Sequence, residues 1–289
     1  MTGQERLEQW ELRWERGLSG RLICDLQVQG PPAFASYLAF SFPSWEWSPV
    51  MPPRQAPFHW AVYGFCGEGE DGEDTLAALL NAFRGRYLVE AGSYGPLAAV
   101  MALFPHGEYL GEFQPTRWGA SIMASKGNQT RGAWQSAAVT DEEWWSELGS
   151  FLSVQPWAAT VRGVAAIPPV ERPPGYPASS PSLVQRMAER ARTRYGLKEV
   201  TLVLDLDTPQ KHVAEPRQRW LNLEQKFTVP EDLPEDLQSN TILVLDDVLS
   251  TGATLRQAGY ALKRAGAACV VALALTRAYP HHIALKEAF

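Results

Sequence analysis

The sequence lacks the features that mark disulfide-stapled, zinc-binding or membrane-spanning proteins. Its three cysteines, Cys24, Cys66 and Cys269, lie far apart without a CxxC pair. This spacing excludes a zinc ribbon and a disulfide framework, and it favours a reducing cytosol. No run of about 18 apolar residues occurs, and the first residues are charged where a signal peptide needs an apolar run. We therefore expect a cytoplasmic protein that is neither secreted nor membrane-spanning.

An excess of positive charge is also absent. Lys and Arg total 26 against 32 for Asp and Glu, so the net charge is -6. Nothing global attracts the chain to a phosphate backbone or an anionic lipid surface. The lysine-bearing phosphate loop GxxxxGK[ST] is missing as well, which argues against a nucleoside triphosphate site of that kind. We expect no direct nucleic-acid binding and no membrane partner.

The chain does contain enough apolar sequence for two folded domains, since 45% of its 289 residues are hydrophobic. Ten of its eleven tryptophans precede residue 160, so the two halves differ in kind. In the first half, apolar and aromatic runs separated by Pro, Gly and acidic tracts predict strands. The predicted strands are 21–28, 36–42, 59–65 and 86–92, and the predicted helices are 5–16 and 74–83. We expect a Trp-rich α+β domain over residues 1–139.

The second half alternates between strand and helix patterns. A capping box from Thr140 to Glu143 predicts a helix over 141–152 that opens this domain. The remaining predicted elements are strands at 161–168, 199–205, 241–247 and 269–276, a helix at 182–195, and a helix after Gly252. Strands that are apolar on both faces and alternate with helices indicate a parallel sheet flanked by helices. We expect an α/β domain over residues 140–289.

The most informative stretch is TILVLDDVLSTGATL, from residue 241 to residue 255. An apolar strand ends in Asp246 and Asp247, and a short loop of hydroxyl residues and glycine then starts a helix. Gly252 allows a tight turn. Free amides at the helix N-terminus suit a phosphate monoester, together with the loop hydroxyls. The candidate phosphate-binding residues are Ser250, Thr251, Gly252, Ala253 and Thr254.

The two carboxylates would repel a phosphate, so they are better suited to accept hydrogen bonds from the hydroxyls of a sugar. A sugar 5-phosphate satisfies both parts of the motif. The alternative is a turn that merely connects a buried strand to a helix, because Asp, Ser, Thr and Gly are common in such turns.

The stretch LVLDDVLSTGATL resembles the phosphoribosyl pyrophosphate (PRPP) signature of the type I phosphoribosyltransferases. The resemblance extends upstream, where Thr208-Pro209-Gln210, Arg219, Asn222 and Phe227 fall at the spacing of the ComF-like branch, also called competence protein F or amidophosphoribosyltransferase-like. Together these segments cover residues 160 to 278. The resemblance implies that Asp246 and Asp247 hold the ribose hydroxyls with Mg²⁺ nearby, and that the loop holds the 5-phosphate.

The resemblance also implies a pyrophosphate loop, which falls here at residues 168–175 and contains Arg172. Lys211 belongs to a basic cluster with His212, Arg217 and Arg219 that would lie over the active site or form a solvated loop. The chain departs from the ComF-like pattern at its start, because a Trp-rich region stands where that branch has a four-cysteine zinc module.

We predict an enzyme, a Mg²⁺-dependent phosphoribosyltransferase, although the sequence leaves the retention of catalysis open. It would transfer the 5-phosphoribosyl group of PRPP to a nitrogen acceptor with release of pyrophosphate. Its catalytic candidates are Asp246, Asp247, Arg172 and Lys211, and Mg²⁺ would lie at the two aspartates. The alternative is a non-catalytic sensor of PRPP or a ribonucleoside monophosphate, or a ComF-like adaptor in DNA uptake or processing. The N-terminal domain is the candidate surface for a protein partner.

Overall fold

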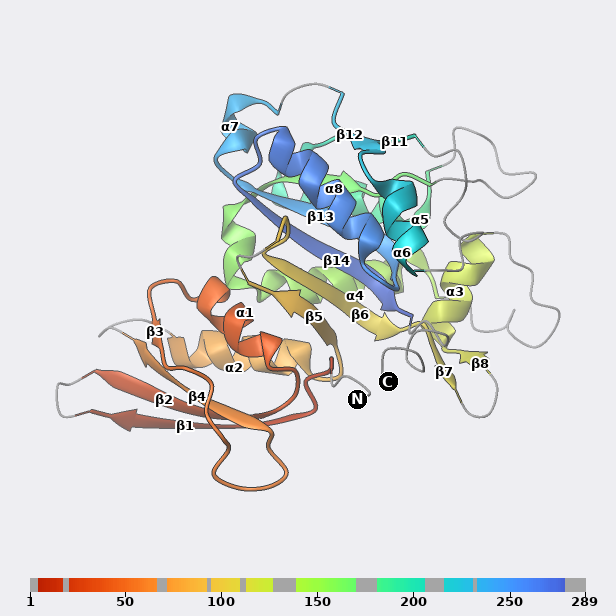
Figure 1. Cartoon of the computed structure of the whole chain (residues 1–289). Coiled ribbons are helices and arrows are strands. Elements are labelled where there is room, and N and C mark those ends of the chain that lie inside the picture. Colours follow the sequence, from red (N-terminus) through yellow and green to blue (C-terminus); the bar gives the residue numbers. More distant parts are fainter. Residues whose placement is uncertain are drawn as a thin grey trace.

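The computed structural model describes residues 5–17, 21–66, 72–92, 95–109, 113–126, 139–169, 181–205, 216–230 and 233–278. These residues form a small antiparallel sheet and a large mixed sheet, with helices between and around them (Figure 1). Two short two-stranded sheets complete the strand pairing of the described part of the chain.

The small sheet comes from the beginning of the chain. Its strands, in spatial order, are β1 (Gln9–Arg16), β2 (Leu22–Gln29), β4 (Trp60–Cys66) and β3 (Glu46–Trp47). Three apolar residues lie opposite one another across three of these strands: Leu12, Leu26 and Val62. Leu26 and Val62 belong to a hydrophobic core that the large sheet shares, and Leu12 packs against it. Helices α1 (Ala33–Ser41) and α2 (Gly72–Phe83) lie between this sheet and the large one (Figure 1).

Two predicted elements of the first half are wrong. Residues 5–16 were expected to be helical, but β1 occupies most of this range because apolar Trp10, Leu12 and Trp14 alternate with charged residues, which is the period of a strand. Residues 36–42 were expected to form a strand, but residues 36–41 belong to α1, whose buried residues recur at helical spacing, and Phe42 is its C-cap. The predicted helix over 74–83 is confirmed and begins two residues earlier, at Gly72.

The large sheet has six strands. In spatial order they are β10 (Lys198–Glu199), β9 (Val161–Ala166), β13 (Thr241–Leu249), β14 (Cys269–Arg277), β6 (Ala99–Pro105) and β5 (Tyr87–Ala91). The first five are parallel, and β5 pairs with β6 in the antiparallel direction. The α/β class and the parallel sheet of the second half are therefore confirmed.

Helices cover both faces of this sheet. On one face lie α4 (Asp141–Ser153) and α5 (Leu183–Tyr195), each beginning with a capping box, which confirms the two helices predicted there. On the other face lie α8 (Ala253–Arg264), α6 (Pro216–Leu223) and α7 (Glu235–Gln238). Alternate residues of β13 enter the two cores: Leu243 and Leu245 on the first side, Ile242 and Val244 on the second.

The large sheet crosses the division expected at residues 139 and 140. Strands β5 and β6 precede that division, yet β6 pairs with β14 over six residue positions from Ala99 to Pro105. The core that contains Leu7 and Leu26 also contains Leu273 and Leu275. A domain boundary between residues 139 and 140 would therefore divide one sheet and one core. Sequence patterns could not show this, because they do not reveal which strands are neighbours.

The remaining described elements connect these layers. They are the β7–β8 hairpin (Gly107–Tyr109 and Phe113–Pro115), α3 (Arg117–Ser125), the 3₁₀ helix η2 (Pro156–Thr160), β11 (Val203–Leu204) and β12 (Phe227–Thr228). The strand predicted over 199–205 is split between β10 and β11, since the chain leaves the large sheet after Val200 and pairs with β12 instead.

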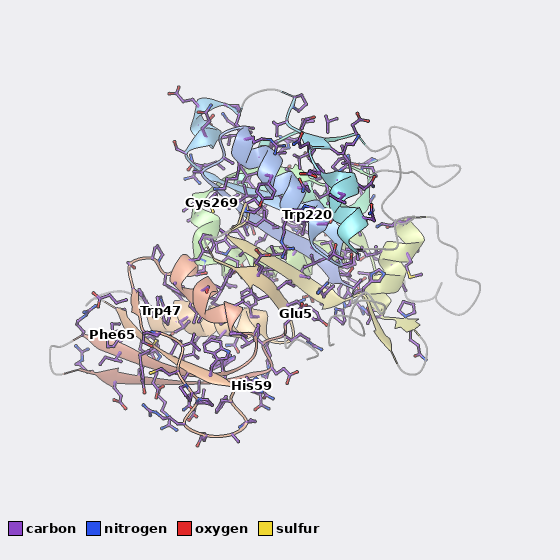
Figure 2. The ribbon with its side chains drawn as sticks, viewed as in Figure 1. Glu5, Trp47, His59, Phe65, Trp220 and Cys269 are labelled. Carbon is purple, nitrogen blue, oxygen red and sulfur yellow. The ribbon has the colours of Figure 1, made fainter. Side chains whose placement is uncertain are left out.

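Five tryptophans, Trp10, Trp14, Trp45, Trp47 and Trp60, lie in or next to the small sheet. Figure 2 shows Trp47 and Phe65 on the small sheet and Trp220 on α6, at the opposite side of the molecule. Among the described residues, no helix combines the length and the apolar character that a membrane crossing requires. All three cysteines are free thiols.

Candidate functional site

The candidate site lies where β13 ends and α8 begins. β13 is an inner strand of the sheet, and its apolar residues hold it between the two helical layers. The chain then turns through Ser250 and Thr251 to Gly252, which is the N-cap of α8 and has a φ of 77°. An L-amino acid with a side chain rarely adopts this left-handed conformation, so the turn requires glycine.

The start of α8 leaves backbone N–H groups available for an anion. The first four amides of an α-helix have no acceptor within the helix, and in the described chain no side chain caps α8. The Ala253 N–H makes only a long contact of 3.4 Å with Thr251 Oγ1. The residues expected to bind phosphate, 250–254, therefore form a turn followed by an uncapped helix N-terminus, which is an arrangement that suits a phosphate group.

Asp246 and Asp247 lie at the end of β13, just before this turn. Asp246 is only 8% exposed, and its Oδ1 accepts a hydrogen bond of 2.8 Å from the backbone N–H of Asp247. Burial, and next the negative charge of Asp247, raise the pKa of Asp246 well above its ordinary value, while Lys126 acts in the opposite direction. Asp246 thus lies in surroundings where hydroxyl donors or a cation would stabilise its ionised form.

The two carboxylates fit the way in which proteins hold Mg²⁺. Carboxylate oxygens are suitable ligands for this cation, which is commonly bound by one or two carboxylates with the phosphates of the substrate. In the described part of the chain no group of three or more His, Cys, Asp or Glu residues could form a metal site by itself. Asp246 and Asp247 would therefore hold Mg²⁺ together with a bound ligand rather than in an all-protein cage.

Lys126 is a site residue that the sequence interpretation missed. Its Nζ lies 2.7 Å from Asp247 Oδ2, and it is the C-cap residue of α3. No motif marks Lys126, which precedes the aspartates by more than one hundred residues. The lysine reaches the site because β6, which leads into the β7–β8 hairpin and α3, is the neighbour of β14 in the sheet.

A second link from the first half reaches the backbone of Asp247. Thr276 Oγ1 donates a hydrogen bond of 3.0 Å to the carbonyl oxygen of Asp247, and His106 Nδ1 lies 3.0 Å from the same Thr276 oxygen. Because the threonine hydroxyl has only one hydrogen, His106 must be the donor to Thr276. Burial lowers the pKa of His106, and the positive charge of Lys126 acts in the same direction, so the ring is neutral near pH 7.

Arg277 is hydrogen-bonded to the backbone at the start of the turn. It is 6% exposed, and its Nη1 donates to the carbonyl oxygens of Leu249, at 3.1 Å, and of Ser250. The other side of its guanidinium binds both carboxylate oxygens of Glu5, at 2.6 and 2.9 Å. Glu5 lies beside the large sheet although it stands near the beginning of the chain (Figure 2). The conformation of the turn thus depends on an ion pair with the N-terminal segment.

Arg256, in the first turn of α8, is held in the same way. Its guanidinium binds Glu90 Oε2, with Nε at 2.9 Å, and Glu90 belongs to β5. Three side chains of the first half, Glu5, Glu90 and Lys126, therefore form ion pairs with residues in or next to the candidate site.

The other predicted site residues lie outside the described part of the chain. Arg172 and Lys211 fall there, as do Thr208-Pro209-Gln210 and His212, and the side chains of Arg217 and Arg219 are likewise not described. Their roles therefore stay predictions. Asn222 is in α6 and Phe227 is in β12, a buried position that contributes to the core beneath α8.

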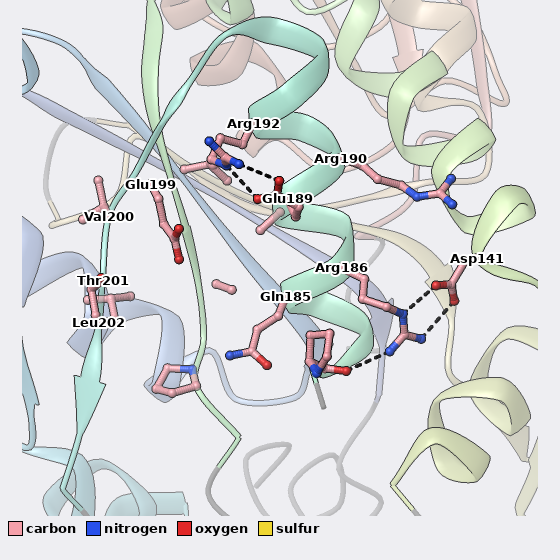
Figure 3. A pocket seen from close by; sticks show the side chains of 15 residues that line it. Asp141, Gln185, Arg186, Glu189, Arg190, Arg192, Glu199, Val200, Thr201 and Leu202 are labelled. Atoms are coloured by element: carbon pink, nitrogen blue, oxygen red, sulfur yellow. Dashed lines mark hydrogen bonds and ion pairs between the residues drawn. The ribbon is translucent and has the colours of Figure 1, made fainter. Parts of the chain in front are cut away.

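A cavity of about 610 Å³ lies between α5 and the chain around residues 199–202 (Figure 3). Its described lining includes three arginines of α5, but none of residues 246–254. Because each of these arginines is neutralised, we do not assign the cavity to phosphate binding. The ion pairs are Arg186 with Asp141, Arg190 with Glu142 and Arg192 with Glu189.

Comparisons with known proteins agree with this geometry. Residues 184–285 match the family described as phosphoribosyl transferase domain, and this range contains the two aspartates, the turn and α8. The match confirms the resemblance to the phosphoribosyltransferase superfamily for this part of the chain. It does not distinguish the ComF-like branch from other branches of that superfamily. No curated protein matches the chain.

One similar solved structure is that of the allosteric regulatory enzyme of purine biosynthesis. The sequences are 12% identical, and the alignment covers 88% of this chain and 46% of that one, with a TM-score of 0.25. The chain thus spans less than half of that protein, and a score of this size carries no argument about fold or function.

Proposed function

We propose that the protein binds PRPP and transfers its 5-phosphoribosyl group to a nitrogen acceptor, because residues 184–285 match the phosphoribosyl transferase domain family. One observation carries the proposal. Two aspartates lie near the end of a buried strand, and a glycine with a φ of 77° then turns the chain into an uncapped helix N-terminus. This arrangement supports a site in which the carboxylates bind the sugar and the neighbouring turn binds the phosphate.

In the proposed reaction the turn binds the 5-phosphate through its N–H and hydroxyl groups. Asp246 and Asp247 accept hydrogen bonds from the ribose hydroxyls and so fix the orientation of the sugar ring. The bond from C1 to the pyrophosphate oxygen breaks, and its electron pair leaves with pyrophosphate. The acceptor nitrogen forms a bond to C1 and releases a proton to solvent. The positive charge that develops at the ribosyl centre is stabilised by the nearby carboxylates.

Mg²⁺, when bound at the aspartates, would supply charge neutralisation for the leaving pyrophosphate. Arg172 and Lys211 belong to this proposal as further cations for the pyrophosphate, on the resemblance alone. The protein needs no covalent nucleophile for this chemistry, because its contribution is to hold the phosphate and the ribose in a fixed geometry.

The second candidate is a non-catalytic protein that binds PRPP or a ribonucleoside monophosphate. One observation favours it: the described cations around the site, Lys126, Arg256 and Arg277, each form an ion pair with a carboxylate of the protein. A sensor of a monophosphate needs no cation free for pyrophosphate. In the second candidate the protein could also act as a ComF-like adaptor in DNA uptake or processing. Residues 1–139 would then provide the surface for a protein partner.

Thermal unfolding with ligands tests both candidates. A ligand that binds only the folded protein stabilises it by about 2.7 kcal/mol at one hundred times its Kd, so the unfolding midpoint rises. We expect a rise with PRPP and Mg²⁺ and with ribonucleoside monophosphates. The absence of any shift at millimolar ligand would contradict both candidates. Release of pyrophosphate from PRPP in the presence of a panel of bases would then distinguish the enzyme from the sensor.

A further inference from the structure

Lys126 lies outside the family-matched range, residues 184–285. It nevertheless contacts Asp247, which together with Asp246 forms the acid pair of the candidate site. Its helix, α3, is fixed at several points. Thr116 caps the helix and donates a hydrogen bond of 2.6 Å to the Pro105 carbonyl oxygen, and the Trp118 ring stacks on Phe104 at 3.8 Å. The backbone N–H of Lys126 still bonds to the last turn of α3. The lysine therefore enters the site from an anchored helix.

The charges around the site single out this lysine among the described cations. Arg256 is bound to Glu90 and Arg277 to Glu5, so both have carboxylate partners from outside the acid pair. Lys126 instead pairs with Asp247, one of the two residues proposed to bind ribose. Its side chain is 48% exposed, against 7% for that of Arg277, so its ammonium group is accessible to a ligand.

Binding of a ribose at Asp247 changes the surroundings of this ammonium. A ribose hydroxyl that donates to Asp247 competes with Lys126 for the same carboxylate oxygens. The hydroxyl-bearing C2 of the ribose is bonded to C1, which in PRPP carries the pyrophosphate. The ammonium is a compact charge on a flexible four-carbon stem, so it can move from the carboxylate to an anionic group on the neighbouring carbon.

We propose that Lys126 is a specificity-determining residue that binds the anionic group at C1 of a ribose 5-phosphate ligand, and so selects PRPP over sugar phosphates that lack this group. The inference rests on the proposed function, because it requires the ribose to lie on the acid pair. It also means that the first half of the chain completes the ligand site of the second half.

The test compares PRPP with ribose 5-phosphate, whose C1 carries only a neutral hydroxyl. Calorimetric affinities in Mg²⁺ buffer are measured for the parent protein and for Lys126→Met. We expect the variant to bind PRPP about tenfold to a hundredfold more weakly, as for loss of a charge-assisted hydrogen bond, and to bind ribose 5-phosphate within about threefold of the parent. Lys126→Arg should regain part of the PRPP affinity, since it restores the charge.

Lys198→Met is the matched control. Lys198 forms an ion pair with Asp236 on the surface and has a similarly exposed side chain, at 54%. This variant should keep both affinities.

The ratio of the two affinities decides the question. A ratio unchanged by Lys126→Met would overturn the inference, because a merely structural ion pair would alter both ligands equally or neither. If the parent protein binds neither ligand, the proposed function itself fails and the inference fails with it.

Discussion

Asp246 and Asp247 are neighbours in the chain, but their surroundings differ. Asp246 is buried and accepts the backbone N–H of the next residue, whereas the side chain of Asp247 is 24% exposed and pairs with Lys126. An asparagine at either position keeps a carbonyl oxygen that can accept a hydrogen bond. Replacement of the two aspartates by asparagine therefore removes the charges with little change of shape.

We expect the double variant Asp246→Asn, Asp247→Asn to lose affinity for PRPP and ribonucleotides while it keeps its affinity for inorganic phosphate. Each lost charge-assisted hydrogen bond costs about 1.5 to 3 kcal/mol, or roughly tenfold to a hundredfold in Kd. Calorimetric titration with both classes of ligand measures this. Unchanged PRPP binding would show that the acids only shape the turn.

Gly252 offers a test of the turn itself. A methyl group added at Gly252 meets no atom closer than 3.6 Å, so the strain of Gly252→Ala comes from its φ of 77° alone. We expect a loss of about 1 to 2 kcal/mol of stability, together with a loss of phosphate binding. Gly196, at the end of α5, has a φ of 65° and open space around it, which makes Gly196→Ala the matched control.

The two alanine variants are compared by urea unfolding and by phosphate titration. Both should be destabilised to a similar degree, and only Gly252→Ala should lose phosphate binding. Equal phosphate affinities in the two variants would argue that the turn is a connection without a binding role.

At the scale of elements, the sequence predicted those whose signals are local. The helices at 141–152 and 182–195 were predicted because their signals, including the capping box at Thr140 for the first, lie within one short segment. The turn at Gly252 was predicted for the same reason. The helix at 33–41 was missed because it is apolar on all sides, so that its run of apolar residues is also compatible with a strand.

The contribution of the first half to the site could not be predicted. Lys126, Glu90 and Glu5 reach the turn only because β6 lies beside β14, and that pairing joins segments that are far apart in the chain. Neither strand carries a pattern that names its neighbour. Strand order is decided by packing in the folded protein, which a single sequence does not display.

The ion pair between Glu5 and Arg277 connects the N-terminal segment to the turn. In Glu5→Gln the buried guanidinium of Arg277 loses its charged partner. We therefore expect a loss of about 1.5 to 3 kcal/mol of stability and a lower affinity for phosphate. Glu46→Gln is the control, because the ion pair of Glu46 with Arg21 is exposed and contributes at most about 1 kcal/mol. Urea unfolding of the two variants measures the difference. Equal losses would show that the Glu5 contact is no stronger than a surface ion pair.

At the scale of the whole molecule, one core joins residues from Leu7 to Leu275. We therefore expect the chain to unfold in a single cooperative transition rather than in two steps. Trp220 is the only tryptophan after residue 160, so in Trp220→Phe the tryptophan fluorescence comes from residues 10–157 alone, all before the family-matched range. Its midpoint in urea should coincide with that of circular dichroism, which reports on all helices. Two separate midpoints would contradict a shared core.

The position of β6 beside β14 also has a consequence during synthesis on the ribosome. β6 ends at Pro105, but the strand that covers its open edge begins at Cys269, more than 160 residues later. At about 5 to 20 residues per second, the nascent chain carries this edge unpaired for roughly 8 to 30 s. The edge belongs to an apolar strand, AVMALFP, of the kind that pairs readily with other chains. Yield in a cell should therefore depend on how well chaperones protect the growing chain over that interval.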